Sequence, residues 1–186
     1  MNKNDPGFIV AVKRNPLYDD YEFRKGCNLD VINFVQDYSS YDTDGLKEFV
    51  FPWKKDLPEA YYCSEMINMF CIKHSESEIN LNRNPDSEED DDVTPYGIQC
   101  NPILIDVPVI NGQYQFRSMD YIFTTTEDDM LADAIRIYSA GFKRRNDLTV
   151  CTHAGIVVVN NGLWIAEMIG GGSVLSGIHK YRRRKE

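Results

Sequence analysis

A cysteine near the start of an amphipathic helix is the first feature of this chain that could do chemistry. Pro58 and Glu59 predict a helix start just before it. Cys63, Ile67 and Phe70 then follow at spacings that place them on one helix face. A helix N-terminus stabilises a thiolate, and the thiolate is the nucleophile in cysteine catalysis. The alternative is that Cys63 is a small buried hydrophobe, as most free cysteines are.

A nucleophilic cysteine needs a base, and the chain has three histidines. His74 would lie about three turns along the helix that carries Cys63, too far to reach the thiol. His179 falls in a basic tail, where a surface role is expected. His153 begins a predicted strand beside Gly155, and a strand-borne histidine facing a helix-borne cysteine is the papain-type arrangement.

The third member of such a site, a group that orients the histidine, depends on the turn at residues 160–162. A two-residue loop would put Glu167 on the sheet face away from His153. A three-residue loop with Gly162 left-handed would set Gly155 opposite Glu167 and make His153 its diagonal neighbour on the same face. The sequence Asn-Asn-Gly suits the second option at least as well as the first, and a half-buried carboxylate needs such a partner.

The elements that must position these residues combine helices with antiparallel strands, which predicts an α+β fold. We expect strands over 8–12, 102–107 and 119–123, and a hairpin of 152–159 with 163–169, followed by the start of a further strand at 174–175. A helix over 29–38 would be capped by Asn28, and a second would run from Thr126 to Gly141. The apolar stripe of the second helix consists of Met130, Leu131, Ala134, Ile135 and Tyr138.

Length and composition predict one domain over residues 1–186. The net charge of −9 argues against a nucleic-acid partner. Residues 75–94 form an acidic stretch that we expect to be a mobile loop, and 180–186 a basic C-terminal tail. The five cysteines are scattered without a CxxC pair, so they predict no zinc site, no disulfide framework and no cofactor. With no visible signal peptide or membrane span, a soluble cytoplasmic protein is expected.

Several segments resemble one family. The Tyr62-Cys63-Ser64-Glu65 segment before an apolar helix is similar to the cysteine motif of the permuted, YiiX-like branch of NlpC-type papain-like amidases and peptidases. Residues 152–157, 164–167 and 170–174 resemble the histidine and glutamate strands of that branch, and 120–123 with 134–136 the segment before them. In that branch the histidine segment precedes the cysteine segment, whereas here Cys63 comes first. We therefore expect a further circular permutation, which requires the two ends of the chain to lie close together.

The resemblance implies a papain-like core with the cysteine helix packed on an antiparallel sheet. It implies Cys63 as nucleophile, His153 as general base and acid, and Glu167 as the orienting carboxylate. The Cys63 backbone N–H, with Tyr62 as a possible second donor, would hold the oxyanion. The expected activity is hydrolysis of an amide or isopeptide bond in a peptide or peptidoglycan fragment. Acyl transfer or thioester hydrolysis on an acyl-lipid substrate, and a non-catalytic binding protein with the same fold, remain alternatives. A metal site using Cys151, His153 and Glu167 lacks convincing ligand spacing, and the oligomeric state is not predicted.

Overall fold

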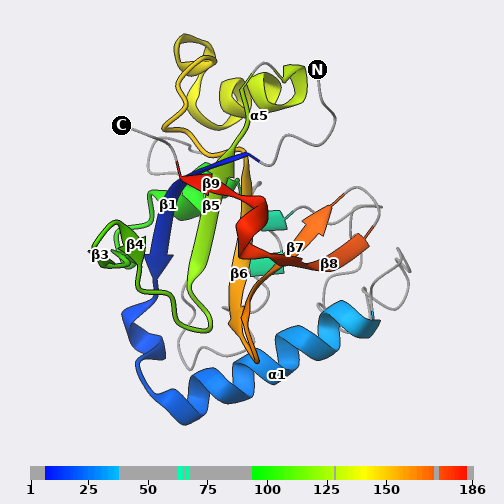
Figure 1. The fold of residues 1–186 in the computed structure, drawn as a ribbon. Helices are drawn as coiled ribbons and strands as arrows, with labels where there is room; N and C mark the ends of the chain where they lie inside the picture. Colours follow the sequence, from blue (N-terminus) through cyan, green and yellow to red (C-terminus); the bar gives the residue numbers. More distant parts are fainter. Residues whose placement is uncertain are drawn as a thin grey trace.

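A sheet of seven strands organises the fold (Figure 1). The computed structural model describes residues 7–37, 63–64, 66–67, 94–127, 129–169 and 172–183. The strands are β1 (Phe8–Arg14), β2 (Ile105–Asp106), β3 (Val109–Ile110), β4 (Gln113–Tyr114), β5 (Tyr121–Thr125), β6 (His153–Val159), β7 (Leu163–Ile169), β8 (Gly172–Gly177) and β9 (Arg182–Arg183). The helices are α1 (Tyr21–Asp37), α4 (Pro95–Gln99) and α5 (Met130–Ala140), with short 3-10 turns η1 (Pro16–Tyr18), η2 (Phe142–Arg144) and η3 (Ile178–Lys180). The expected α+β class is confirmed. None of the helices in these ranges is long and apolar enough to cross a membrane.

The sheet brings the two ends of the described chain together. Its strand order is β2-β1-β5-β6-β7-β8 with antiparallel neighbours, and β9 pairs in parallel with β1. Phe8 is paired with Arg182, and the Arg182 N–H donates to the Gly7 carbonyl at 3.2 Å. The chain therefore returns from β8 through η3 to its first strand, as the red and blue segments show (Figure 1). The expected closeness of the ends is confirmed.

The two faces of the sheet carry separate apolar clusters because successive strand residues point to opposite sides. On one side Ala154, Ile156 and Val158 of β6 belong to the cluster that includes α1 and the helical residues Cys63 and Ile67. On the other side Val157 packs with residues of β1, β5 and β7. Ile67 is fully buried and Cys63 is 9% exposed. The predicted inward face of the cysteine helix is therefore confirmed at these two positions.

The β6–β7 hairpin has the three-residue loop that places Glu167 on the face of His153. Val159 pairs with Leu163, and Gly155 pairs with Glu167. The left-handed residue in the loop is Asn161, with φ 48°, whereas Gly162 has φ 143°, a value that side-chain-bearing residues rarely adopt. The expected loop length is confirmed, and only the residue that takes the left-handed conformation differs.

Three expected element boundaries are wrong, each because a different polar side chain caps a turn. Helix α1 begins at Tyr21, since Asp20 Oδ1 accepts from the Phe23 N–H at 2.9 Å; Asn28 is inside the helix. The expected strand over 102–107 is reduced to β2, because Asn101 closes a turn with the backbone of Ile103 and Leu104. Helix α5 begins after Asp129, whose carboxylate accepts from the Leu131 N–H, while its predicted end at Gly141 is confirmed.

The orientation of α5 also differs from the expectation. Of its predicted apolar stripe, Met130, Leu131 and Tyr138 are largely exposed, whereas Ala132, Arg136 and Ser139 are buried. The stripe was expected to face the core, and that prediction is wrong.

Some expectations lie outside the described residues. These are the start of the cysteine helix at 58–62, Phe70, His74, nearly all of the acidic stretch 75–94, and residues 184–186 of the basic tail. The part of that tail that the structure does describe, residues 180–183, is not a free tail, because it holds the end of η3 and the strand β9.

Candidate functional site

A short hydrogen bond joins His153 to Glu167. The His153 Nε2 lies 2.6 Å from Glu167 Oε2. His153 opens β6, and Glu167 is paired with Gly155 on the neighbouring strand, so the two side chains are diagonal neighbours on one face. A Cβ on Gly155 would lie 2.5 Å from Ile165 Cγ2 and 3.5 Å from Glu167 Cβ, so a glycine is needed where β7 crosses close over it. The predicted contact between His153 and Glu167 is confirmed.

Cys63 completes this chain of contacts from the other side of the imidazole. Its thiol and the His153 side chain are hydrogen-bonded. An ionised carboxylate can only accept, so Nε2 donates to Glu167 and Nδ1 is left to face the sulfur. Ala154 and Cys63 belong to one apolar cluster, whereas His153 alternates to the other face. The cysteine can reach the imidazole because His153 is the first residue of its strand, where the two faces meet.

Glu167 is held by three further groups that sequence reasoning missed. The Tyr181 hydroxyl donates to Oε2, and Lys180 Nζ lies 3.3 Å from Oε1. Ser176 of β8 adds another hydrogen bond. The carboxylate is 1% exposed, so each lone pair without a donor would cost free energy. A buried glutamate in an apolar strand indicated that partners exist, but only the return of η3 to β1 shows that Lys180 and Tyr181 supply them.

The electrostatics of the three residues favour a thiolate–imidazolium pair. Burial alone would raise the pKa of Cys63, but the charge and hydrogen bond of His153, with backbone hydrogen bonds from Ala154 and Ser64, outweigh it and lower that pKa. Burial alone would lower the pKa of His153, yet Cys63 and then Glu167 raise it to about 10. Burial likewise opposes ionisation of Glu167, and the hydrogen bond and charge of His153, with Ser176 and Tyr181, lower its pKa to about 2. A lowered cysteine pKa beside a raised histidine pKa is the signature of an activated nucleophile.

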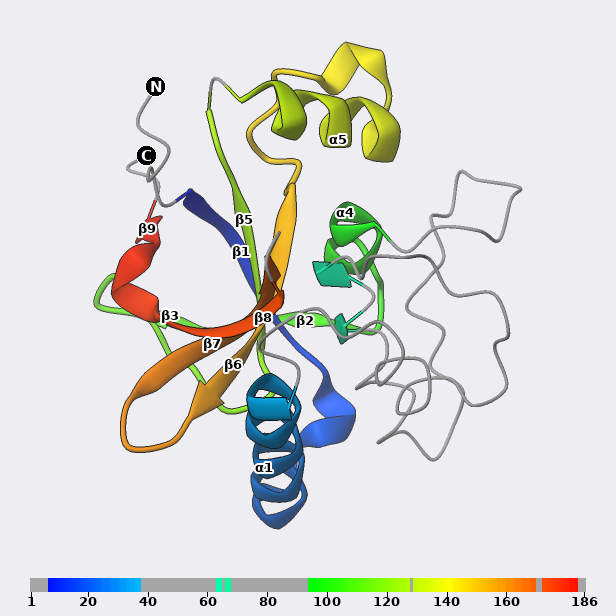
Figure 2. The ribbon, with the colours of Figure 1, turned by 90° about the vertical axis from the view of Figure 1, so that its right-hand side faces the viewer.

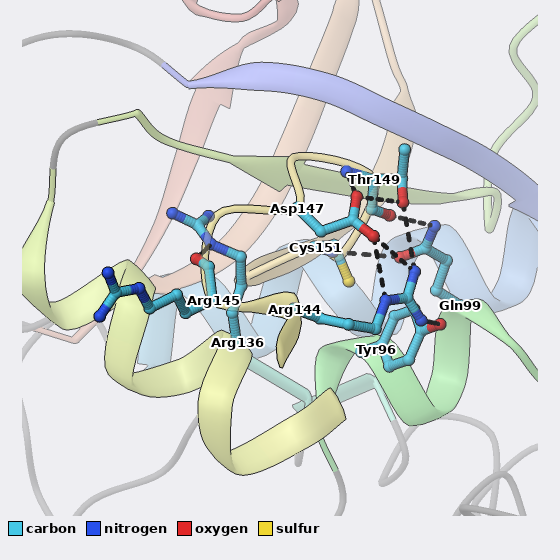
Figure 3. A network of polar contacts seen from close by, with 8 residues as sticks. All are labelled: Tyr96, Gln99, Arg136, Arg144, Arg145, Asp147, Thr149 and Cys151. Carbon is cyan, nitrogen blue, oxygen red and sulfur yellow. Dashed lines mark hydrogen bonds and ion pairs between the residues drawn. The ribbon is translucent and has the colours of Figure 1, made fainter. Parts of the chain in front are cut away.

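A polar network fixes the segment that leads into His153 (Figure 3). The Cys151 N–H donates to Gln99 Oε1 at 3.2 Å, and Gln99 Nε2 donates to the Thr149 carbonyl at 3.2 Å. Arg144 binds Asp147 at 2.8 Å and also donates to the Tyr96 hydroxyl. Helix α4 is thus tied to the loop before β6, which holds the start of that strand in place.

The remaining candidate groups are placed less favourably. Tyr62, predicted as a second oxyanion donor, lies outside the described residues. Cys151 is fully buried, and this burial, with the neighbouring charges of Cys63 and Cys100, raises the pKa of its thiol well above the ordinary value. His179 is exposed on η3, away from Glu167's hydrogen-bond partners. Within the described ranges, no group of three or more His, Cys, Asp or Glu side chains could hold a metal ion.

The site can therefore supply a nucleophile, a proton carrier and an orienting carboxylate from three separate segments. The His153 side chain is 27% exposed, so a ligand can approach the imidazole even though Cys63 and Glu167 are almost covered. Comparison with known proteins finds no matching family model, no matching curated protein and no matching solved structure.

Proposed function

We propose that this protein is a cysteine hydrolase of the amidase or peptidase type, with a papain-like, NlpC-type core. The observation that carries the proposal is the unbroken chain of hydrogen bonds from Cys63 through His153 to Glu167. Three residues from distant parts of the sequence meet in the order that nucleophile, base and orienting group require. The hydrogen-bonded Ser176, Lys180 and Tyr181 keep Glu167 ionised and fixed in position.

In the proposed reaction the Cys63 thiolate attacks the carbonyl carbon of an amide or isopeptide bond. The carbon–nitrogen bond breaks, and the proton on His153 Nδ1 goes to the leaving amine. Water then attacks the thioacyl carbonyl and gives a proton back to His153, and the carbon–sulfur bond breaks to release a carboxylic acid. Glu167 keeps Nε2 protonated, so the imidazole presents Nδ1 to the reacting atoms throughout.

The arrangement of the chain ends supports the proposed family relationship. A further circular permutation needs the ends to be adjacent, and β9 lies hydrogen-bonded beside β1. The β6–β7 register, with Glu167 opposite Gly155, is the one that the histidine and glutamate motifs need. A non-catalytic protein would have no need for a lowered cysteine pKa beside a raised histidine pKa, so these shifts favour catalysis.

The test is covalent labelling with a peptide-based acyl electrophile, read by intact and peptide mass spectrometry. The wild-type protein should take up one label on Cys63 at neutral pH, and Cys63→Ala should take up none while keeping its circular dichroism spectrum. His153→Ala should slow labelling of Cys63 by about 10²-fold or more, because general-base catalysis contributes about that much. Labelled protein that regains free thiol with time, faster when a nucleophilic amine is added, would identify a thioacyl intermediate.

Cys100 needs a control because it is the one described cysteine that is exposed. The experiment is therefore run in a Cys100→Ser background, and buried Cys151 serves as the internal reference for an unactivated thiol. Equal labelling of the Cys63→Ala variant, or labelling of Cys63 that does not depend on His153, would refute the assignment.

A further inference from the structure

Helix α5 turns its apolar face to solvent and its polar face to the protein. Met130 is 88% exposed, and Leu131 and Tyr138 are each 67% exposed. Ala134 is exposed between them, one turn from both Met130 and Tyr138, and Phe142 just beyond the helix is 66% exposed. An apolar helix face of this kind on a protein surface marks an interaction site.

The inverted orientation is built in by a buried arginine. Arg136 is 1% exposed and donates through Nε to the Arg145 carbonyl at 2.7 Å and through Nη2 to Asp133 at 2.9 Å. It also binds Thr125 Oγ1 and the Thr126 carbonyl at the end of β5. Turning α5 over would leave this guanidinium without its acceptors, so the apolar face stays outward.

The charges at the two ends of α5 have opposite signs. Exposed Glu127 and the capping residue Asp129 precede the helix, and exposed Lys143 and Arg145 follow it. A second copy of the helix laid antiparallel across the first would set each acidic end against the other copy's basic end. The face is thus complementary to itself.

We propose that the apolar face of α5 is a homodimer interface, formed by two copies related by a two-fold axis level with residue 136. Four pairs across that axis match in chemistry: Glu127 with Arg145, Asp129 with Lys143, Met130 with Phe142, and Ala134 with Tyr138. The last two pair a thioether with an aromatic ring and a small side chain with a large one. Each pair occurs twice, as an isologous interface requires.

The location of α5 leaves room for a second copy. In both ribbon views α5 lies beyond one end of the sheet, and α1 lies at the opposite end (Figures 1 and 2). The interface does not involve Cys63, His153 or Glu167, so the proposal is independent of the proposed function.

Analytical ultracentrifugation at about 100 μM protein tests the proposal, since weak homodimers with micromolar dissociation constants are populated there. Wild type should sediment as a dimer. Leu131→Asp should shift it to a monomer, whereas the matched change Leu29→Asp, at an exposed leucine of α1, should not. Circular dichroism establishes that both variants are folded.

Charge reversal gives a second test that a merely apolar or adventitious association would fail. Glu127→Lys alone and Arg145→Glu alone each place like charges across the axis, so each should raise the dissociation constant by about tenfold or more. The double variant restores opposite charges in both pairs and should return to within about threefold of wild type. A monomeric wild type overturns the proposal, as does a double variant no better than the single ones. Monomer that instead floats with phosphatidylserine vesicles through Leu131 would assign the face to a membrane and overturn it as well.

Discussion

Replacing Glu167 by glutamine should weaken the ion pair at the candidate site without unfolding the protein. Glutamine has nearly the same shape, and its oxygen can still accept from His153 and Tyr181. Its amide nitrogen would then face Lys180, whose side chain is 46% exposed and can turn to solvent. The change therefore removes a charge while leaving the buried donors paired.

The magnitude follows from the short contact between His153 and Glu167. With Nε2 and Oε2 2.6 Å apart, the charges are centred about 4 Å from each other, and their attraction is about 4 kcal/mol at an effective dielectric constant near 20. That is an upper limit of about three pKa units, and the hydrogen bond kept by glutamine reduces it to about two. The imidazolium state of His153 beside the Cys63 thiolate should lose about a hundredfold in population relative to the neutral pair.

The assay is the rate of alkylation of Cys63 by iodoacetamide, followed by peptide mass spectrometry across about pH 4 to 10. Wild type should show a plateau that begins below the ordinary thiol pKa and extends to about pH 10, where His153 loses its proton. Glu167→Gln should lower the plateau by up to about a hundredfold and move its upper limb to lower pH.

Asp120→Asn is the matched control. Asp120 is also a carboxylate at 1% exposure, but it pairs with Arg14 at 2.7 Å and does not contact the histidine. Its replacement may cost stability but should leave the alkylation profile unchanged. A folded Glu167→Gln protein with the wild-type profile would refute the claim that Glu167 sustains the ion pair.

Three further changes test other parts of the site. Tyr181→Phe removes a donor from Glu167, so it should raise the pKa of that carboxyl group and lower the free energy of unfolding by about 1–2 kcal/mol in urea titrations, whereas Tyr138→Phe on the surface should change neither. Because the pKa of Glu167 falls from 4.5 to about 2 on folding, its stabilisation of about 3 kcal/mol is complete above pH 4.5 and should be lost as the pH falls toward 2; an equal loss in Glu167→Gln would contradict this. Deleting Gly162 shortens the β6–β7 loop to two residues and should turn Glu167 away from His153, abolishing the alkylation plateau; a normal plateau would show that the register does not set the site.

The contact between His153 and Glu167 could be predicted because it depends on a count. Side chains alternate along a strand, so the number of residues in the 160–162 loop decides which face Glu167 occupies. The pairing of a cysteine helix with a histidine strand could likewise be inferred from residue types and by excluding His74 and His179. These are local arguments, and they hold wherever a hairpin forms.

The roles of Lys180 and Tyr181 could not be predicted in the same way. Their contacts with Glu167 depend on the chain passing through η3 and pairing β9 with β1, residues that are far apart in sequence. A cluster of basic residues near a chain end is usually solvated, which made the tail interpretation the reasonable one. No pattern within residues 180–183 indicates the strand that they join.

Helix α5 shows why an amphipathic pattern predicts a covered face but not what covers it. The stripe through Met130 and Tyr138 is real, and the expectation that it packs inward assumed that the core lies on the apolar side. Arg136 reverses this, because its several acceptors lie at the end of β5 and in the turn after α5 and can be reached only if the polar side faces the protein. Burying an arginine with full hydrogen bonding at the cost of an exposed apolar face is unfavourable for a monomer. It becomes favourable when a second copy covers that face, so the buried arginine and the proposed dimer explain each other.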